Sequence, residues 1–81
     1  MNQKNFLDQN SQIIDLKMPK MNLKFVSINV FSRSLINIDL SENKIKTLPD
    51  EIANIGTLQM LKIDHNLIEA LPKDLWKLSK L

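Results

Sequence analysis

The 81-residue sequence contains no cysteine and no tyrosine, and it has a single glycine. Without thiols the chain cannot form a disulfide or a thiolate-ligated zinc site. With Gly56 alone it cannot form a glycine-rich loop that binds phosphate groups. No apolar stretch approaches the roughly 18 residues that a membrane-spanning helix needs, and residues 1–12 lack the apolar run of a secretory signal. The sequence therefore predicts a cytoplasmic protein that does not enter the membrane.

Charge of one sign is scarce as well. Eleven Lys and Arg residues are interspersed with nine Asp and Glu residues, which leaves a net charge of +2. No polybasic segment indicates binding to nucleic acid or to anionic lipid, so neither is expected as a partner. Hydrophobic residues make up 43% of the chain and aromatic residues only 5%. We therefore expect a core of repeated Leu and Ile side chains rather than an aromatic cluster.

The second half of the chain repeats with a period of 23 residues. Asn43 and Pro49 recur as Asn66 and Pro72, and the aliphatic positions that frame the unit recur as well. The aliphatic pairs are Leu35 and Leu58, Ile38 and Leu61, Leu40 and Ile63, Ile45 and Ile68, Leu48 and Leu71, Ile52 and Leu75, and Ile55 and Leu78. Such a period is typical of a solenoid, in which each unit packs on the one before it.

Upstream the pattern is weaker. The first unit keeps the apolar frame and is one residue shorter, but Met21 stands at the Asn position and Ser27 at the Pro position. Terminal repeats are often atypical in this way. The expected organisation is a polar extension over residues 1–12, flexible or acting as a partial cap, and a repeat domain over residues 13–81, with units 13–34, 35–57 and 58–80 and a further unit that begins at Leu81.

The two full units, LINIDLSENKIKTLPDEIANIGT and LQMLKIDHNLIEALPKDLWKLSK, resemble the leucine-rich repeat family, in the 23-residue form common in intracellular proteins. The resemblance implies an α/β fold, a leucine-rich repeat solenoid that forms a horseshoe segment. Short parallel strands would lie on its concave face and short helical turns on its convex face. The resemblance also implies a module for protein–protein interaction.

The spacing within a unit assigns a role to its polar positions. Alternate residues of a strand point to the same side, so Ile38 and Leu40 face the core and Asp39 faces outward. Asn43 and Asn66 follow the strands, where the chain must bend. Asn tolerates unusual backbone angles, and its amide both donates and accepts hydrogen bonds. The family resemblance implies that these residues form a structural ladder inside successive turns.

The two prolines are also expected to be structural. Pro49 and Pro72 restrict the corner that follows the second aliphatic pair, because proline fixes φ and offers no N–H group. Ile52 and Ile55 are three residues apart, which suits a short helical turn after that corner.

Side chains that point away from the core should form columns across the turns. One column contains Lys17, Asp39 and Lys62, and another contains Lys20, Glu42 and His65. Charges of opposite sign alternate in both, so neighbours attract one another weakly. The pattern fits a self-compensated surface or a mixed-charge docking face flanked by exposed apolar side chains. The predicted partner-binding residues are Lys17, Ile36, Asp39, Glu42, Met60, Lys62, Asp64 and His65, with Ile14 and Ser41 beside them.

The same polar residues could suggest an enzyme or a metal centre. His65 stands between Asp64 and Asn66, but one His without a second ligand nearby is weak support for a metal or acid–base site. Ser41 has no histidine near it that could activate a nucleophile. We expect no catalytic residue, no cofactor and no metal, and therefore no enzymatic activity. Trp76 is expected to be half-buried on the convex side, or to contact a neighbouring domain.

The sequence thus predicts a scaffold or signalling module that binds a protein partner of unknown identity on its concave face. The alternative is the N-terminal recognition fragment of a larger leucine-rich repeat enzyme or signalling protein, with a catalytic domain beyond Leu81. Because Leu71, Leu75 and Leu78 would lack an outer neighbour, we expect further repeats, a partner or a second copy to cover that end. Three units are near the minimum for a solenoid, so stability should be marginal.

Overall fold

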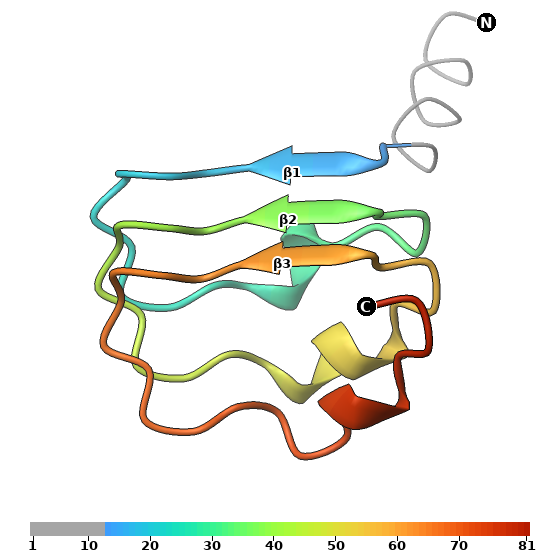
Figure 1. Ribbon diagram of the computed structural model, residues 1–81. Helices are drawn as coiled ribbons and strands as arrows, with labels where there is room; N and C mark the ends of the chain where they lie inside the picture. Colours follow the sequence, from blue (N-terminus) through green and yellow to red (C-terminus); the bar gives the residue numbers. More distant parts are fainter. Residues whose placement is uncertain (1–12) are drawn as a thin grey trace, which may run out of the picture.

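The computed structural model describes residues 13–81, so the extension expected over residues 1–12 lies outside the described part of the chain. Three short strands form one parallel sheet in the order β1-β2-β3 (Figure 1). Their bounds are Asp15–Lys17 for β1, Asn37–Asp39 for β2 and Met60–Lys62 for β3. Each strand opens one turn of the chain, and the turns lie side by side.

The register of the sheet follows the repeat. Leu16 of β1 lies opposite Ile38 of β2, and Ile38 lies opposite Leu61 of β3. The partners are 22 and 23 residues apart, which are the lengths of the first and second units. Parallel strands need a long connection between them, and here the rest of each unit supplies it.

Each unit also contains one short 3-10 turn. The bounds are Ile28–Val30 for η1, Asp50–Asn54 for η2 and Leu75–Lys77 for η3. In Figure 1, η2 and η3 lie below the sheet, at the side of their turns away from the strands. Pro49 precedes η2 with φ −66°, an angle that the proline ring favours. In the first unit Ser27 takes that position and accepts a hydrogen bond from the Asn29 N–H at 3.2 Å.

The second unit and its border supply the centre of the core. Its fully buried side chains are Leu35, Ile38, Leu40, Ile45, Ile52 and Leu58. This unit has a neighbouring turn on both sides, so its apolar side chains are covered from both directions. Each such side chain contributes about 1.5–3 kcal/mol when it leaves water. The middle turn therefore holds the two outer turns together.

Equivalent leucines differ in burial according to whether another described turn packs over them. Leu48 of the second unit is 6% exposed, whereas Leu71 at the same place in the third unit is 56% exposed. The expectation that the last turn leaves its leucines uncovered is therefore right for Leu71. It is wrong for Leu78, which is buried because η3 packs against η2. Leu75 packs on the core while staying partly exposed.

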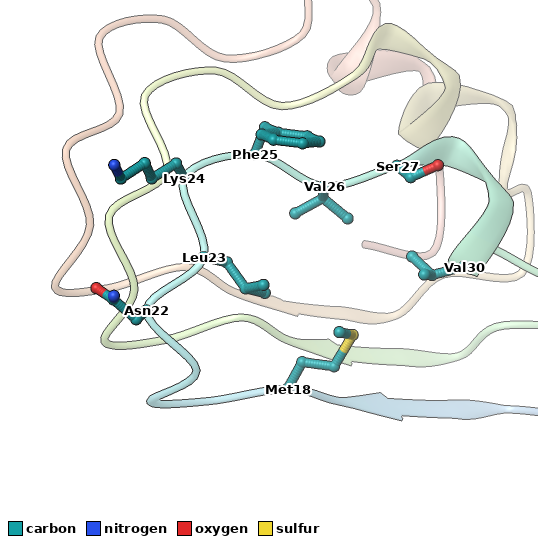
Figure 2. A pocket seen from close by; sticks show the side chains of 8 residues that line it. All are labelled: Met18, Asn22, Leu23, Lys24, Phe25, Val26, Ser27 and Val30. Atoms are coloured by element: carbon teal, nitrogen blue, oxygen red, sulfur yellow. The ribbon is translucent and has the colours of Figure 1, made fainter.

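The first unit encloses its core loosely. Met18, Leu23, Val26 and Val30 point toward one another inside this turn and line a pocket of about 440 Å³ (Figure 2). Val26 is buried, but Val30 is exposed although it stands at the position of Ile52. Smaller side chains at shared positions leave this turn incompletely filled, as expected for a degenerate repeat.

Candidate interaction surface

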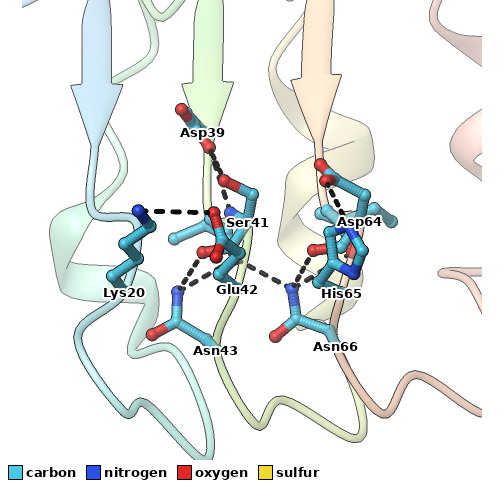
Figure 3. Close-up of polar contacts among 10 residues, drawn as sticks. Lys20, Asp39, Ser41, Glu42, Asn43, Asp64, His65 and Asn66 are labelled. Carbon is cyan, nitrogen blue, oxygen red and sulfur yellow. Dashed lines mark hydrogen bonds and ion pairs between the residues drawn. The ribbon is translucent and has the colours of Figure 1, made fainter.

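The side-chain amide of Asn43 holds the end of the strand segments in place (Figure 3). Its Oδ1 accepts hydrogen bonds from the backbone N–H groups of Met21 at 2.9 Å and Leu23 at 3.0 Å. Its Nδ2 donates to the carbonyl oxygens of Met18 and Leu40, both at 2.9 Å. One buried side chain thus satisfies backbone groups in its own turn and in the turn before it.

Asn66 repeats this arrangement one turn later. Its Oδ1 accepts from the backbone N–H of Ile45 at 3.1 Å. Its Nδ2 donates to the carbonyl oxygens of Leu40 at 2.9 Å and Ile63 at 3.1 Å. The two amides therefore link all three turns through hydrogen bonds and fix the spacing of whatever side chains those turns expose.

The bend after each strand lies one residue earlier than the sequence suggested. Among residues 13–81, the non-glycine residues with positive φ are Lys20, Asn22, Glu42 and His65, each at 56°. Glu42 and His65 directly precede Asn43 and Asn66, which were expected to adopt the unusual backbone angles. That expectation is wrong, because the ladder amides turn into the core while the exposed residues before them adopt the left-handed conformation. Histidine is one of the residues enriched in that conformation.

Outward-pointing side chains of the strands and of the bends form one surface, which we call the sheet face. Its charged residues are Asp15, Lys17, Lys20, Asp39, Glu42, Lys62, Asp64 and His65, and its main apolar residue is Met60. The strand register places Lys17 opposite Asp39 and Asp39 opposite Lys62, as the columns require. In the second column, the Lys20 Nζ atom lies 3.9 Å from the Glu42 Oε2 atom. Alternating charge across the turns is therefore realised in space.

Asp39 is engaged within its own turn. Its Oδ1 accepts hydrogen bonds from the Ser41 backbone N–H at 3.0 Å and from the Ser41 hydroxyl at 2.7 Å. The backbone N–H first, and then the hydroxyl, hold the pKa of Asp39 below its ordinary value, with smaller contributions from Lys62 and Lys17. Ser41 itself is only 3% exposed. The expectation that Ser41 is available for recognition is wrong, because its hydroxyl serves the Asp39 carboxylate.

Asp64 and His65 stay near the surface. The His65 Nε2 atom lies 3.7 Å from the Asp64 Oδ2 atom, and both side chains are about half exposed or more. Across residues 13–81, no group of three or more His, Cys, Asp or Glu side chains is arranged to hold a metal ion. The pair therefore offers one imidazole and one carboxylate for contact with another molecule.

The apolar side chains beside the sheet face differ in exposure. Met60 lies opposite Asn37 in the strand register. Ile36 is only partly exposed, whereas Met60 and Ile14 are exposed. Asn37 donates from Nδ2 to Asp15 Oδ1 at 2.7 Å. Adding the unit lengths to residue 15 would have aligned Asp15, Asn37 and Met60 from the sequence alone.

Trp76 is not half-buried, as one of the two expectations for it required. Trp76 lies in η3 and is 78% exposed, and the Lys77 Nζ atom lies 5.6 Å from the centroid of its ring. An ammonium group at that distance attracts the face of the indole ring weakly when both are exposed to water. Trp76 lies outside the sheet face.

The comparisons with known proteins fit this geometry. A family model described as "Leucine rich repeat" matches residues 15–68, which include all three strands and both ladder Asn residues. The chain belongs to the leucine-rich repeat family. Its parallel three-stranded sheet and 3-10 turns are those of a small leucine-rich repeat unit stack. Within residues 13–81, no helix is long and apolar enough to cross a membrane.

One relative shares sequence with this leucine-rich repeat chain. "Disease resistance protein RPS5" of Arabidopsis thaliana is 40% identical over 48 residues, which are 58% of this chain and 5% of the relative. The chain therefore corresponds to only a small part of that protein's length. No solved structure matches the chain.

Proposed function

We propose that this leucine-rich repeat chain is a protein-interaction module that binds a protein partner on its sheet face, the concave face of a horseshoe. The observation that carries the proposal is the rigid, mixed-charge surface that the strand register creates. Leucine-rich repeat domains in general mediate protein–protein interaction, which supports the same assignment. The proposed contacts are Lys17, Ile36, Asp39, Glu42, Met60, Lys62, Asp64 and His65.

The proposed mechanism is presentation of side chains at a fixed spacing. The Asn43 and Asn66 amides tie neighbouring turns together, so the backbone below the sheet face does not need to be ordered when a partner binds. Binding to a preorganised surface loses less conformational entropy than binding to a flexible one. Met60 supplies exposed apolar surface beside charged neighbours, which is the usual composition of an interaction patch.

The charge pattern favours a partner with a matching pattern. Lys62 is exposed beside Asp39, whose carboxylate is kept ionised by Ser41. Glu42 and His65 follow in the next column. A partner whose acids face Lys17 and Lys62 and whose bases face Glu42 would be attracted, and the reverse arrangement would be repelled.

The same module could serve as the recognition part of a larger enzyme or signalling protein, which is the alternative to a free-standing scaffold. The relative named above is many times longer than this chain and is a disease resistance protein by name. By analogy, a cytoplasmic signalling role without catalytic activity in these residues is part of our proposal. Nothing favours the larger-enzyme alternative over the interaction module itself.

The test is affinity capture from source cells followed by titration of the captured partner. The sheet-face variant carries Glu42→Lys and Lys62→Glu, and the control variant carries Glu51→Lys and Lys80→Glu. Both variants keep the net charge, and all four residues are exposed. We expect the sheet-face variant to bind the partner about tenfold more weakly and the control to stay within about twofold. Equal affinities of both variants and the parent would reject the sheet face as the binding surface.

A further inference from the structure

A second surface, made by the loop that follows each strand's bend, gathers lysines that are scattered in the sequence. Backbone hydrogen bonds hold these loops side by side: the Lys44 N–H donates to the Leu23 carbonyl at 2.7 Å, and the Glu69 N–H to the Lys46 carbonyl at 3.1 Å. Adding the unit lengths aligns Lys24 with Lys46 and Lys46 with Glu69. We call the surface formed by Lys24, Lys44, Lys46 and Leu67 the loop face.

The loop face is hollowed. Three lysines and one leucine line one pocket of about 370 Å³. Leu67 is 55% exposed and occupies the position at which the first two units have the polar residues Asn22 and Lys44. Phe25, next to Lys24 in the chain, is also largely exposed. The surface therefore combines positive charge with uncovered apolar area.

One acid, Glu69, lies in the column of Lys46, but the other lateral neighbours of the three lysines carry no negative charge. No ion pair connects Lys24, Lys44 or Lys46 to any residue in the described part of the chain. The loops at residues 22–27 and 44–49 contain no acidic residue. Like charges placed side by side on neighbouring strands destabilise the fold slightly. The three exposed lysines therefore do not stabilise the fold, and their charges are available to bind an anion.

We propose that the loop face binds an acidic peptide segment that carries one apolar side chain. The carboxylates would lie against the three lysines, and the apolar side chain would cover Leu67. Lysine ammonium groups are point charges on flexible side chains, and they can donate hydrogen bonds to carboxylates from several directions. Removing Leu67 and the apolar ligand group from water would add to the charge attraction.

A peptide fits this surface better than a nucleic acid. The three lysines surround a single pocket and do not continue along a track, because the column that begins with Lys24 and Lys46 ends at Glu69. A long polyanion would therefore meet a carboxylate in the next turn.

The inference is independent of the proposed function, because the two surfaces share no residue. A partner could contact both, but a loss of binding at one face leaves the other face unchanged. The loop face can therefore be tested with a short peptide, without knowledge of the natural partner.

The experiment measures fluorescence anisotropy of a labelled peptide of alternating Asp and Glu with one central Leu, at low salt. The loop-face variant carries Lys44→Gln and Lys46→Gln, and the matched control carries Lys73→Gln and Lys80→Gln. Each variant loses two positive charges at exposed positions. We expect about tenfold weaker binding to the loop-face variant, a change of less than about twofold for the control, and weaker binding at high salt. Replacing the central Leu of the peptide by Ala should weaken binding further.

Amide chemical shifts of the parent protein supply a second readout that needs no substitution. Peptide addition should shift Lys24, Lys44, Lys46 and Leu67 and leave Lys17 and Lys62 unchanged. Shifts centred on the sheet face, or equal losses for both variants, would overturn the proposal. A single-stranded oligonucleotide of equal charge that binds as tightly as the peptide would overturn the choice of a peptide as ligand.

Discussion

The sheet face and the loop face are made by the same three turns, but their charges are arranged in opposite ways. On the sheet face, Lys17 and Lys62 flank Asp39 across the strands, and an ion pair joins Lys20 to Glu42. On the loop face, Lys24 aligns with Lys46, and neither forms an ion pair with a described residue. The first surface has its charges balanced within the protein, and the second does not.

This difference shows how a repeat controls its surface. The unit length decides which residues become lateral neighbours, and a single residue change in one unit then decides whether those neighbours attract or repel. Each exposed pair affects folding by only a few tenths of a kcal/mol, so both arrangements are compatible with the same fold. A charged side chain without an ion-pair partner is available for a ligand. A charged side chain in an ion pair must first leave its partner.

The largest expected effect comes from removing the support that both faces share. We expect Asn43→Leu to lower the free energy of unfolding by about 2–4 kcal/mol, because it leaves backbone groups of Met18, Met21 and Leu23 without their side-chain partner. Urea-induced unfolding followed by circular dichroism measures this change. In a domain of marginal stability, the loss could unfold most of the population.

The control for this substitution is Asn54→Leu, at an exposed asparagine in η2. We expect it to change the free energy of unfolding by less than about 0.5 kcal/mol. Asn66→Leu should fall between the two, because fewer backbone groups depend on Asn66. If Asn43→Leu behaved like the Asn54 control, the two faces would not depend on the ladder.

A smaller effect separates the two faces directly. Lys24→Glu would convert the column of Lys24, Lys46 and Glu69 into alternating charges, so we expect it to stabilise the protein by about 0.3 kcal/mol at low salt. Lys17→Glu has the same change in net charge but places a second acid beside Asp39, so it should destabilise. Thermal unfolding at low salt should show shifts of opposite sign.

Salt provides the control for these charge reversals. Ions at about 1 M reduce the screening length to about 3 Å, so both shifts should shrink toward zero. Shifts of the same sign for both variants would mean that the two faces do not differ in charge balance.

Much of the fold could be predicted because the period alone fixes the strand register. Leu16, Ile38 and Leu61 align across the sheet as the repeat requires. The place of a turn in the stack correctly predicted that Leu71 is exposed although it occupies the position of the buried Leu48. The same reasoning was wrong for Leu78, because the packing of η3 on η2 has no signal in the motif. The motif also gives no sign that Glu42 and His65, rather than the ladder Asn residues, adopt the left-handed conformation.

The surfaces were less predictable for a different reason. The alternating columns of the sheet face follow from the unit lengths, and the same arithmetic would have aligned Lys24 with Lys46. A count of charges along the chain does not reveal this lysine cluster, because the acidic residues that are near in the sequence belong to another face. The use of Ser41 as a partner of Asp39 depends on the local path of the chain after β2 and has no signal in the repeat.

The smallest expected effect concerns the protonation of Asp39 on the sheet face. Because hydrogen bonds from Ser41 lower the pKa of Asp39, the ionised carboxylate stabilises the folded state at a pH above its unfolded-state pKa, near 3.9. This stabilisation is lost as the pH falls below about 4 and through the lowered pKa of the folded state. Ser41→Ala removes the hydroxyl and keeps the backbone N–H, so the pKa of Asp39 should rise part of the way toward its ordinary value. NMR titration of the side-chain carboxyl carbon measures the shift, and Ser79→Ala is the control that should leave it unchanged. An Asp39 pKa that does not move in Ser41→Ala would show that the backbone N–H and the flanking lysines suffice to keep the centre of the sheet face charged.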